Sequence, residues 1–264
     1  MSLTWLFEPY VLPELHERMR ASARHHGFQA RAWDDCWLES WPPLDEDFVV
    51  FHGSLATAAT IRENSPWEPG AYCNVRAFEC SAWYSQSRTR LLHREWSALT
   101  VQELVDDPAR AFARFGSPES LFVRPDSALK PFAGRVIQRE AVNLRALDHG
   151  FYFNDTSTNV VLAPVRKVGR EWRYVVVDGR VVAGSAYTAD SRAAMKDDPR
   201  GSPWQFADAI ARELPSPDVA YVLDVCESDG ELWLLELNPF SGADLYACDT
   251  DDVVEAIGQI VMKG

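Results

Sequence analysis

Two carboxylates and an amide lie in consecutive apolar segments of the sequence. Asp224 stands within the run 219–226, and Glu236 and Asn238 alternate with leucines in the next run, 231–237 and beyond. Side chains of a β-strand alternate between its two faces, so Glu236 and Asn238 share one face of their strand. A turn at Ser228-Asp229-Gly230 joins the two runs into a predicted hairpin. The three oxygen-bearing side chains can therefore converge from adjacent strands.

The flanking apolar residues predict that these strand ends are buried. A buried carboxylate without a cation is costly. Mg²⁺ takes oxygen ligands, and proteins often hold it with one or two carboxylates plus substrate phosphates. Asp224, Glu236 and Asn238 are therefore candidate magnesium ligands. The spacing also fits carboxylates on a half-solvated hairpin, so by itself it leaves both interpretations open.

Upstream residues offer groups for a phosphorylated ligand. Glu171 and Arg173 lie two apart on a predicted strand, where they either face solvent or bind sugar hydroxyls and phosphate, since a guanidinium suits bidentate bonding. Arg124 and Lys130 flank a turn-rich loop and would neutralise polyphosphate charge. This loop has few glycines and is a weak phosphate-binding motif alone. The sequence has neither a G-x-x-x-x-G-K-[ST] loop nor a G-x-G-x-x-G turn after the first strand.

The elements that must position these groups change character along the chain. The first part reads as strand, helix, strand, strand, helix, which is typical of a small parallel-sheet domain. Gly53-Ser54, at a strand end, fits either a ligand-binding turn or a plain turn. The predicted strands are 3–8, 28–33 and 47–52, and the predicted helices are 13–26 and 55–62.

The later part is expected to be mostly antiparallel strands with helices, giving an α/β (α+β) fold class overall. Residues 82–115 are predicted to be largely helical. Asp178-Gly179 is a strong turn signal between two strands. The predicted strands are 121–124, 135–138, 159–163, 171–177, 180–187, 219–226 and 231–237, and the predicted helices are 203–214 and 251–262.

Composition narrows the class of protein. The formal net charge of −13 over 264 residues counts against nucleic acid or an anionic membrane as a partner. The five cysteines form no C-x-x-C pair, which indicates reduced thiols. The sequence shows no signal peptide and no run of about 18 apolar residues, so we expect a cytoplasmic protein without a membrane span.

The order of these pieces resembles the ATP-grasp superfamily across residues 118–262. Phe-Val-Arg-Pro-Asp-Ser-x-x-Lys-x-Phe-x-Gly at 122–134 is similar to the signature of the clade in which arginine replaces the usual strand lysine. The resemblance implies a pre-ATP-grasp domain at 1–95, with a small parallel sheet, and an ATP-grasp domain at 96–264. The two subdomains of the latter would enclose ATP.

The resemblance also implies residue roles. Two features depart from the family's pattern: the segment 161–165 has no acidic partner for adenine, and the 122–134 loop has few glycines. The implied ligands are Arg124 and Lys130 for the ATP phosphates, backbone groups of Ala163, Pro164 and Val165 for adenine, Glu171 for ribose or nearby cations, Arg173 for the γ-phosphate or an acyl-phosphate, and Asp224, Glu236 and Asn238 for Mg²⁺. Arg173 and Lys130 would be the catalytic residues.

Two functions follow from the resemblance. The first is an ADP-forming ligase that joins an unknown carboxylate to an unknown amine through an acyl-phosphate. Its acceptor side would involve Ser241, Gly242 and Asp244, or 187–192, each of which is equally an ordinary loop. The alternative is an ATP-binding assembly chaperone with a protein partner. It is suggested by Glu-Trp-Arg at 171–173 and Asn-Pro-Phe at 238–240, which are similar to segments of eukaryotic cell-division-cycle ATP-grasp proteins that chaperone assembly of a translation initiation factor.

Overall fold

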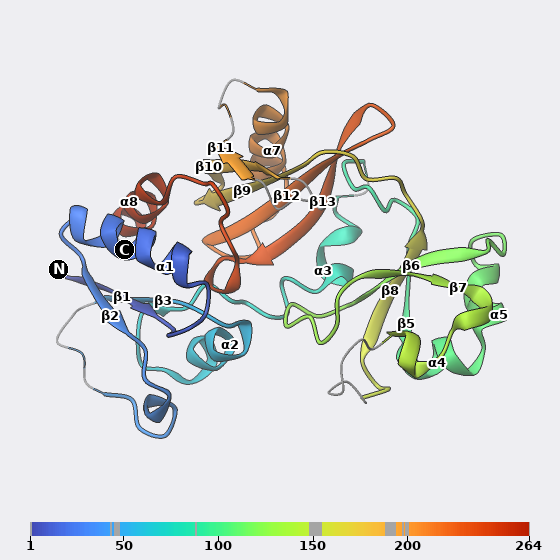
Figure 1. Cartoon of the computed structure of the whole chain (residues 1–264), viewed down its shortest axis with the longest axis horizontal. Helices are drawn as coiled ribbons and strands as arrows, with labels where there is room; N and C mark the ends of the chain where they lie inside the picture. The colour runs from blue at the N-terminus through green and yellow to red at the C-terminus, as the bar shows by residue number, and fades with distance from the viewer. Residues whose placement is uncertain are drawn as a thin grey trace. The chain divides into compact units, whose positions relative to one another are not determined.

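The computed structural model describes residues 2–42, 44, 48–87, 89–147, 155–187, 194–196, 198 and 201–263. Its packing divides the chain into two compact units (Figure 1). The first unit combines both ends of the chain, Met1–Asn74 and Val168–Gly264, and the second is the middle, Val75–Lys167. The predicted division into domains 1–95 and 96–264 stays a prediction, because a compact unit and an independently folding domain are different properties.

A parallel four-stranded sheet opens the first unit, in the order β2-β1-β3-β4. Its central strand β1 (Leu3–Phe7) is buried along its whole length, as expected for a parallel strand covered on both faces. The predicted order of strands and helices is confirmed, with ends that differ by one or two residues; position 47 lies outside the described residues. The other elements are α1 (Pro13–His25), β2 (Gln29–Ala32), the 3-10 helix η1 (Asp35–Leu38), β3 (Phe48–His52), α2 (Leu55–Asn64) and β4 (Pro69–Gly70).

A five-stranded antiparallel sheet completes the first unit, in the order β11-β10-β9-β12-β13. Both predicted hairpins are present. Asp178 and Gly179 have positive φ angles of 50° and 70°, the backbone that a two-residue hairpin turn requires. The elements are β9 (Glu171–Val177), β10 (Arg180–Tyr187), β11 (Ala194–Lys196), α7 (Ser202–Glu213), β12 (Ala220–Ser228), β13 (Glu231–Pro239), the 3-10 helix η3 (Phe240–Gly242) and α8 (Thr250–Val261).

Each hairpin contains one bulge, where pairing shifts by one residue. In β10 the shift lies between Val181 and Ala183, and in the β12–β13 pair it lies beyond Asp224, which pairs with Glu236. A one-residue shift moves a side chain to the opposite face of the sheet. Without the second bulge, Asp224 would pair with Leu235, and Glu236 would point to the other face. The bulge therefore places Glu236 beside Asp224.

The core of the first unit lies between its two sheets. Trp5 and Phe7 of β1 belong to one apolar cluster with Val175 of β9, Val222 of β12 and Phe240 of η3. Helices α1 and α8 pack beside each other and add their apolar sides to the same cluster (Figure 1). The N-terminal and C-terminal segments thus form one interior, which fixes the large sheet against the parallel one.

The second unit contains a four-stranded antiparallel sheet in the order β5-β8-β6-β7. The predicted strands of this region are confirmed. The helical prediction for 82–115 is wrong at β5, which pairs with β8 and buries Leu99 in the unit's core. The elements are α3 (Cys80–Tyr84), β5 (Ser97–Thr100), α4 (Val101–Asp106), α5 (Pro108–Ala113), β6 (Ser120–Pro125), β7 (Arg135–Gln138), the 3-10 helix η2 (Arg139–Ala141), α6 (Leu144–Leu147) and β8 (Asn159–Pro164). Among the described residues, no helix has the length and apolar character needed to span a bilayer.

Candidate functional site

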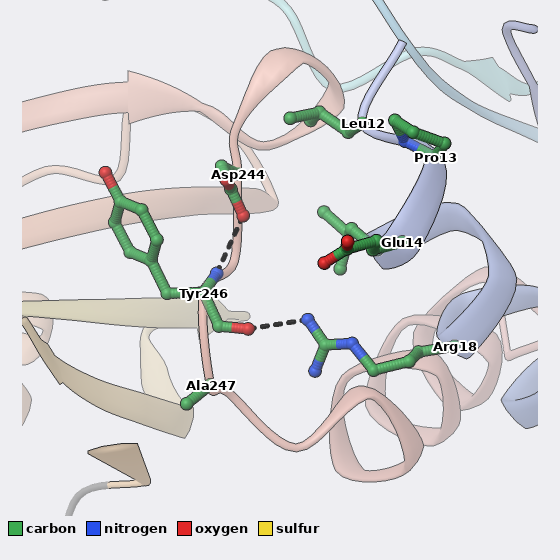
Figure 2. A pocket seen from close by; sticks show the side chains of 8 residues that line it. Leu12, Pro13, Glu14, Arg18, Asp244, Tyr246 and Ala247 are labelled. Atoms are coloured by element: carbon green, nitrogen blue, oxygen red, sulfur yellow. Dashed lines mark hydrogen bonds between the residues drawn. The ribbon is translucent and has the colours of Figure 1, made fainter. Parts of the chain in front are cut away.

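A pocket of about 630 Å³ opens between α1 and the segment after η3 (Figure 2). Arg18 of α1 reaches across and donates to the carbonyl oxygens of Tyr246, at 2.5 Å, and Cys248, at 3.3 Å. On the far wall, Oδ1 of Asp244 accepts the Tyr246 N–H at 2.9 Å. These bonds join the two walls and hold the loop in place. The lining residues are Leu12, Pro13, Glu14, Leu15, Arg18, Asp244, Tyr246 and Ala247.

Behind this pocket, a row of polar residues crosses the large sheet. Arg173 of β9 pairs with Ser185 of β10 on one side and with Asp224 of β12 on the other, and Asp224 pairs with Glu236 of β13. Residues directly opposite one another on antiparallel strands point to the same face. Asn238 lies two residues beyond Glu236 and shares that face. The structure therefore brings Arg173, Asp224, Glu236 and Asn238 together on one face of the sheet.

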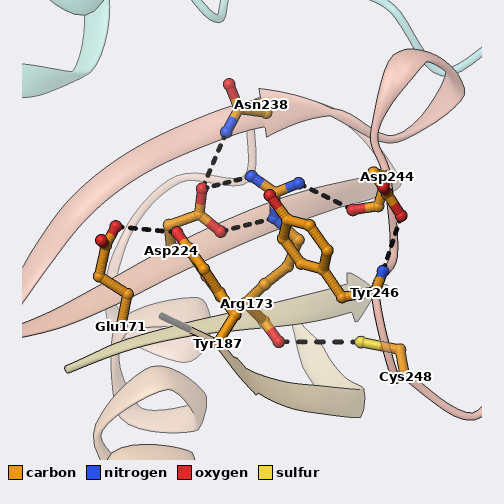
Figure 3. Close-up of polar contacts among 8 residues, drawn as sticks. All are labelled: Glu171, Arg173, Tyr187, Asp224, Asn238, Asp244, Tyr246 and Cys248. Atoms are coloured by element: carbon orange, nitrogen blue, oxygen red, sulfur yellow. Dashed lines mark hydrogen bonds and ion pairs between the residues drawn. The ribbon is translucent and has the colours of Figure 1, made fainter. Parts of the chain in front are cut away.

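Arg173 and Asp224 form a buried bidentate ion pair (Figure 3). Nε of Arg173 donates to Oδ1 of Asp224 at 2.9 Å, and Nη2 donates to Oδ2 at 2.8 Å. The two side chains are only 11% and 1% exposed. Nη1 of Arg173 donates to the carbonyl of Asp244 at 2.7 Å, which connects the pair to the pocket wall. Burial opposes the guanidinium charge, but the attraction of Asp224 outweighs it and raises the pKa of Arg173.

Two tyrosines enclose the ion pair. The centre of the Arg173 guanidinium lies 4.7 Å from the Tyr246 ring centroid and 5.9 Å from that of Tyr187, both within the range of cation–π attraction. The Tyr187 hydroxyl donates to Oε2 of Glu171 at 2.9 Å (Figure 3). Burial raises the pKa of Glu171, and the charges of Asp224 and Glu236 add to that rise, whereas the Tyr187 hydrogen bond and Arg173 oppose it.

The oxygen atoms of this face fit a hard cation. Nδ2 of Asn238 donates to Oδ2 of Asp224 at 3.3 Å, while Oδ1 of Asn238 is buried and accepts no hydrogen bond in the described part of the chain. A buried acceptor without a donor is costly, and a bound cation would satisfy it. A carboxylate offers about four lone-pair sites, so the bonds to Asp224 do not saturate it. Asp224, Glu236 and Asn238 thus suit Mg²⁺ in donor chemistry.

The remaining predicted ligands belong to the second unit. Arg124 lies half-buried on β6, and its charge adds to burial in lowering the pKa of His93 to about 4. His93 stacks on Phe122 at 4.8 Å between ring centroids. A Cβ atom at Gly134 would come within 2.8 Å of Phe122, so the loop 125–134 closes against β6 only with glycine there.

Lys130 stands exposed on the same loop, with a left-handed φ of 47°. On the neighbouring strand β8, Ala163 pairs with Phe122 and Pro164 with Leu121, and the exposed Val165 follows. The predicted ligands thus fall into two sets, one in each compact unit. The roles assigned to them from the sequence stay predictions.

The structure also places the predicted acceptor residues. Asp244 lines the pocket, whereas Ser241 and Gly242 are used in packing: the Ser241 hydroxyl accepts the N–H of Tyr72 at 2.9 Å, and Gly242 lies against Leu55. Tyr187 faces Glu171, and positions 188–192 lie outside the described residues. At the Gly53-Ser54 turn, the chain's own carboxylate of Glu8 accepts from the Ser54 N–H at 2.5 Å.

Sequence reasoning missed Arg18 and Tyr246, which complete the pocket and the cover over Arg173. Neither residue carries a local signal, because α1 and the segment after η3 are more than 200 residues apart in the chain. The tyrosine opposite Glu171 was accessible in part, since the turn at Asp178-Gly179 sets the hairpin. A register without the bulge would have placed Ala186, not Tyr187, opposite Glu171.

Comparisons with known proteins agree on the family and the fold. The matching family model describes an ATP-grasp domain, family 2 of the clade in which arginine replaces the usual strand lysine, and it covers residues 92–256, more than half of the chain. None of the curated proteins matches the sequence.

Several solved structures share the fold. D-cycloserine synthetase DcsG superposes with a TM-score of 0.67 at 15% identity, covering 99% of this chain and 100% of that chain. The ATP-grasp ligase PsnB, solved with its minimal precursor, Mg and ADP, has a TM-score of 0.60 at 13% identity, covering 97% of this chain and 96% of that chain. The D-alanine–D-alanine ligase from Bacillus anthracis, in complex with ATP, has a TM-score of 0.59 at 13% identity, with coverage of 100% and 99%. The fold class predicted from the sequence is confirmed.

Proposed function

The chain belongs to family 2 of the ATP-grasp clade with arginine in place of the strand lysine, and from this premise we propose that it is an ATP- and Mg²⁺-dependent ligase that joins a carboxylate to an amine. The observation that carries the proposal is the polar row on one buried face of the large sheet, where Arg173, Asp224 and Glu236 pair across three strands. Such a row is costly unless it serves a charged ligand. Relatives of the same fold are ligases by name, and PsnB was solved with Mg and ADP.

In the proposed site, Asp224, Glu236 and Asn238 hold Mg²⁺. The bound ion would neutralise charge on the nucleotide phosphates and the transferred phosphoryl group. The buried, unsatisfied Oδ1 of Asn238 supports this assignment, since it lacks a donor in the described part of the chain. Glu171 would hold the ribose, and its bond to Tyr187 fixes the direction of its carboxylate.

The second unit would supply the remaining nucleotide contacts. Arg124 and Lys130 would bind the phosphates, and backbone groups of Ala163, Pro164 and Val165 would meet adenine. Support comes from their placement on adjacent strands and one loop: Arg124 lies on β6, which pairs with β8 up to Pro164. The loop that carries Lys130 returns against β6 at Gly134.

The proposed chemistry needs no protein nucleophile. The γ-phosphoryl group of ATP moves to an oxygen of the substrate carboxylate, and ADP leaves. The amine nitrogen then attacks the acyl carbon and loses a proton, the bond from that carbon to the phosphate oxygen breaks, and phosphate leaves. Arg173 and Lys130 would stabilise the charge that develops on the transferred group, and the fixed bonds of Arg173 to Asp224 and Asp244 pre-orient its guanidinium.

The pocket beside Arg173 is the proposed acceptor site. Its volume of about 630 Å³ is within the usual range for a small-molecule site. Asp244 joins it to the ion pair, because the backbone carbonyl of this residue binds Arg173 while its side chain lines the pocket. An amine or a carboxylate end of a small molecule or peptide would reach the polar row from there.

Nucleotide binding is tested first, by thermal shift. ATP with Mg²⁺ is expected to raise the melting temperature, because a ligand that binds only the folded state stabilises it. The Mg²⁺-dependent part should vanish in the double variant Asp224→Asn/Glu236→Gln, and in Glu236→Gln alone should shrink without breaking the Arg173 ion pair. Glu231→Gln, an exposed acid on the same hairpin, is the matched control. A full Mg²⁺-dependent shift in both site variants would refute the metal assignment.

Turnover is tested second. The protein with ATP, Mg²⁺ and a panel of carboxylate–amine pairs should release ADP and phosphate in a one-to-one ratio with the amide product. ATP binding without turnover on the panel and on a cell extract would refute the ligase. If, in addition, the protein captures a single stoichiometric partner, the assembly-chaperone alternative suggested by the segments 171–173 and 238–240 is supported.

A further inference from the structure

Three metal-ligating side chains meet where the end of α1 faces the start of α8. His25 is the last residue of α1, His26 follows it, and Asp251 stands in the first turn of α8. One ligand atom from each lies within 4.8 Å of the others. Among the described residues this is the sole group of three histidine, cysteine or acidic side chains with such spacing. It shares no residue with the proposed nucleotide site or with the pocket.

The backbone around this cluster is held rigidly. One turn before His26, the hydroxyl of Ser22 bonds to that of Thr250 at 3.0 Å in a buried position, which fixes the two helix ends against each other. The His26 ring stacks on Phe28, with 6.1 Å between centroids and 26° between planes. Phe28 in turn fits against α8 at Gly258, where an added Cβ would clash with the ring. The ligand atoms are therefore preorganised by packing, not by the cluster itself.

The spacing matches a coordinated metal. Ligand atoms about 2.0–2.1 Å from a tetrahedral Zn²⁺ are separated from each other by roughly 3.3–3.4 Å. Nδ1 of His25 lies 3.0 Å from Oδ1 and 3.2 Å from Oδ2 of Asp251, and Nε2 of His26 lies 3.3 Å from Oδ2. Nε2 of His26 is also shielded from solvent and makes no hydrogen bond in the described part of the chain, despite its nearness to Asp251.

We propose that His25, His26 and Asp251 form a binding site for a divalent transition-metal ion of the zinc class. Two imidazoles and a carboxylate are a ligand set that such ions prefer over Mg²⁺. The fourth position is open to water or to Glu255, which lies one turn along α8 and whose charge acts on His25. The bound ion joins the first and last long helices of the first unit, so it stabilises the packing of the two chain ends against each other.

A simpler role for the same residues is an ion pair at two helix ends. A cation at the end of α1 and an anion at the start of α8 both suit the helix dipoles. That role needs only one histidine next to Asp251, and His25 alone supplies it. It does not account for the buried and unsatisfied Nε2 of His26, which points the second imidazole at the same carboxylate.

Calorimetric titration with ZnCl₂ tests the site, on full-length protein freed of any affinity tag and of metal, in a Cys36→Ser background because Cys36 is the exposed thiol of the described residues. We expect one ion per chain and a rise in melting temperature on binding. His26→Ala and Asp251→Asn should each weaken the affinity by about tenfold or more, as loss of a ligand does. Co²⁺ in place of Zn²⁺ should give a visible absorption band that the same variants remove.

The matched control is Asp252→Asn, which removes the same charge from the same turn of α8 at an exposed position. It should leave the affinity unchanged. If His26→Ala is poorly folded, His25→Ala serves instead, because that side chain is 72% exposed. No binding, or equal affinity in the control and the ligand variants, means an adventitious ion only and overturns the proposal. Neither result bears on ATP binding, so the nucleotide site is judged separately.

Discussion

In the first unit the candidate site is built on a buried ion pair, whereas in the second unit the candidate cations stand at half-buried or exposed positions. Arg173 and Asp224 are 11% and 1% exposed and are bonded in two places. Arg124 is half-buried on a strand, and Lys130 is exposed on a loop. Both regions belong to the residues that the family resemblance assigns to one nucleotide.

The difference lies in what holds each charge in position. In the first unit, protein groups replace water around the charges, so removing one partner leaves the other uncompensated in the interior. In the second unit, solvent shares the stabilisation of the cations. Stability and ligand binding should therefore be coupled in the first region and separable in the second.

The strongest test of this contrast is Arg173→Ala. The substitution leaves Asp224 buried without its bidentate partner, and we expect a loss of about 3–5 kcal/mol in the free energy of unfolding. Urea denaturation followed by circular dichroism measures it. Arg173→Lys is the control that keeps the charge but not the fork geometry, and it should lose less. A cost below about 1 kcal/mol for Arg173→Ala would mean that the pair behaves like a surface ion pair, and the contrast would fail.

A smaller effect should appear in the pH dependence of stability. The pKa of Glu171 is raised above its ordinary value of 4.5, chiefly by burial, so the folded state holds its proton to higher pH than the unfolded state. Stability must then fall as pH rises from 4.5 through the raised pKa. Glu171→Gln keeps an acceptor for Tyr187 but cannot ionise, so it should lack this fall and gain stability relative to the parent chain above that window.

Urea unfolding at a series of pH values between about 4 and 8 provides the comparison. Glu227→Gln, at the other end of the same sheet and not part of the polar row, should follow the parent curve. Parallel curves for Glu171→Gln and the parent would show that the Glu171 carboxylate titrates as it does in the unfolded chain.

Local sequence signals were enough for the elements but not for the register that makes the site. The turn at Asp178-Gly179 and the apolar runs around it fix both hairpins, because turn chemistry and strand alternation are short-range properties. The bulges are not written in either signal. The bulge beyond Asp224 determines that Glu236 shares its face, and the pairing of β9 with β12 brings in Arg173 from about 50 residues away.

The union of the two chain ends was likewise beyond local reading. Patterns in the first 74 residues predicted a parallel sheet correctly, yet nothing in them indicates that Trp5 and Phe7 share a core with Val175 and Val222. Amphipathic periodicity shows that a face is buried but not what buries it. The pocket between α1 and the segment after η3 depends on that pairing, so Arg18 could be found only in three dimensions.

The smallest effect on stability is expected in the second unit. Lys130→Ala replaces an exposed side chain, and its free energy of unfolding should change by no more than about 0.5 kcal/mol. The same substitution should reduce the ATP-induced rise in melting temperature, because it removes a cation proposed to contact phosphate. Lys263→Ala, an exposed lysine in the other unit, should change neither quantity. An unaltered ATP response in Lys130→Ala would remove this residue from the nucleotide site, whereas a large loss of stability would show that its left-handed loop position carries packing that solvent does not replace.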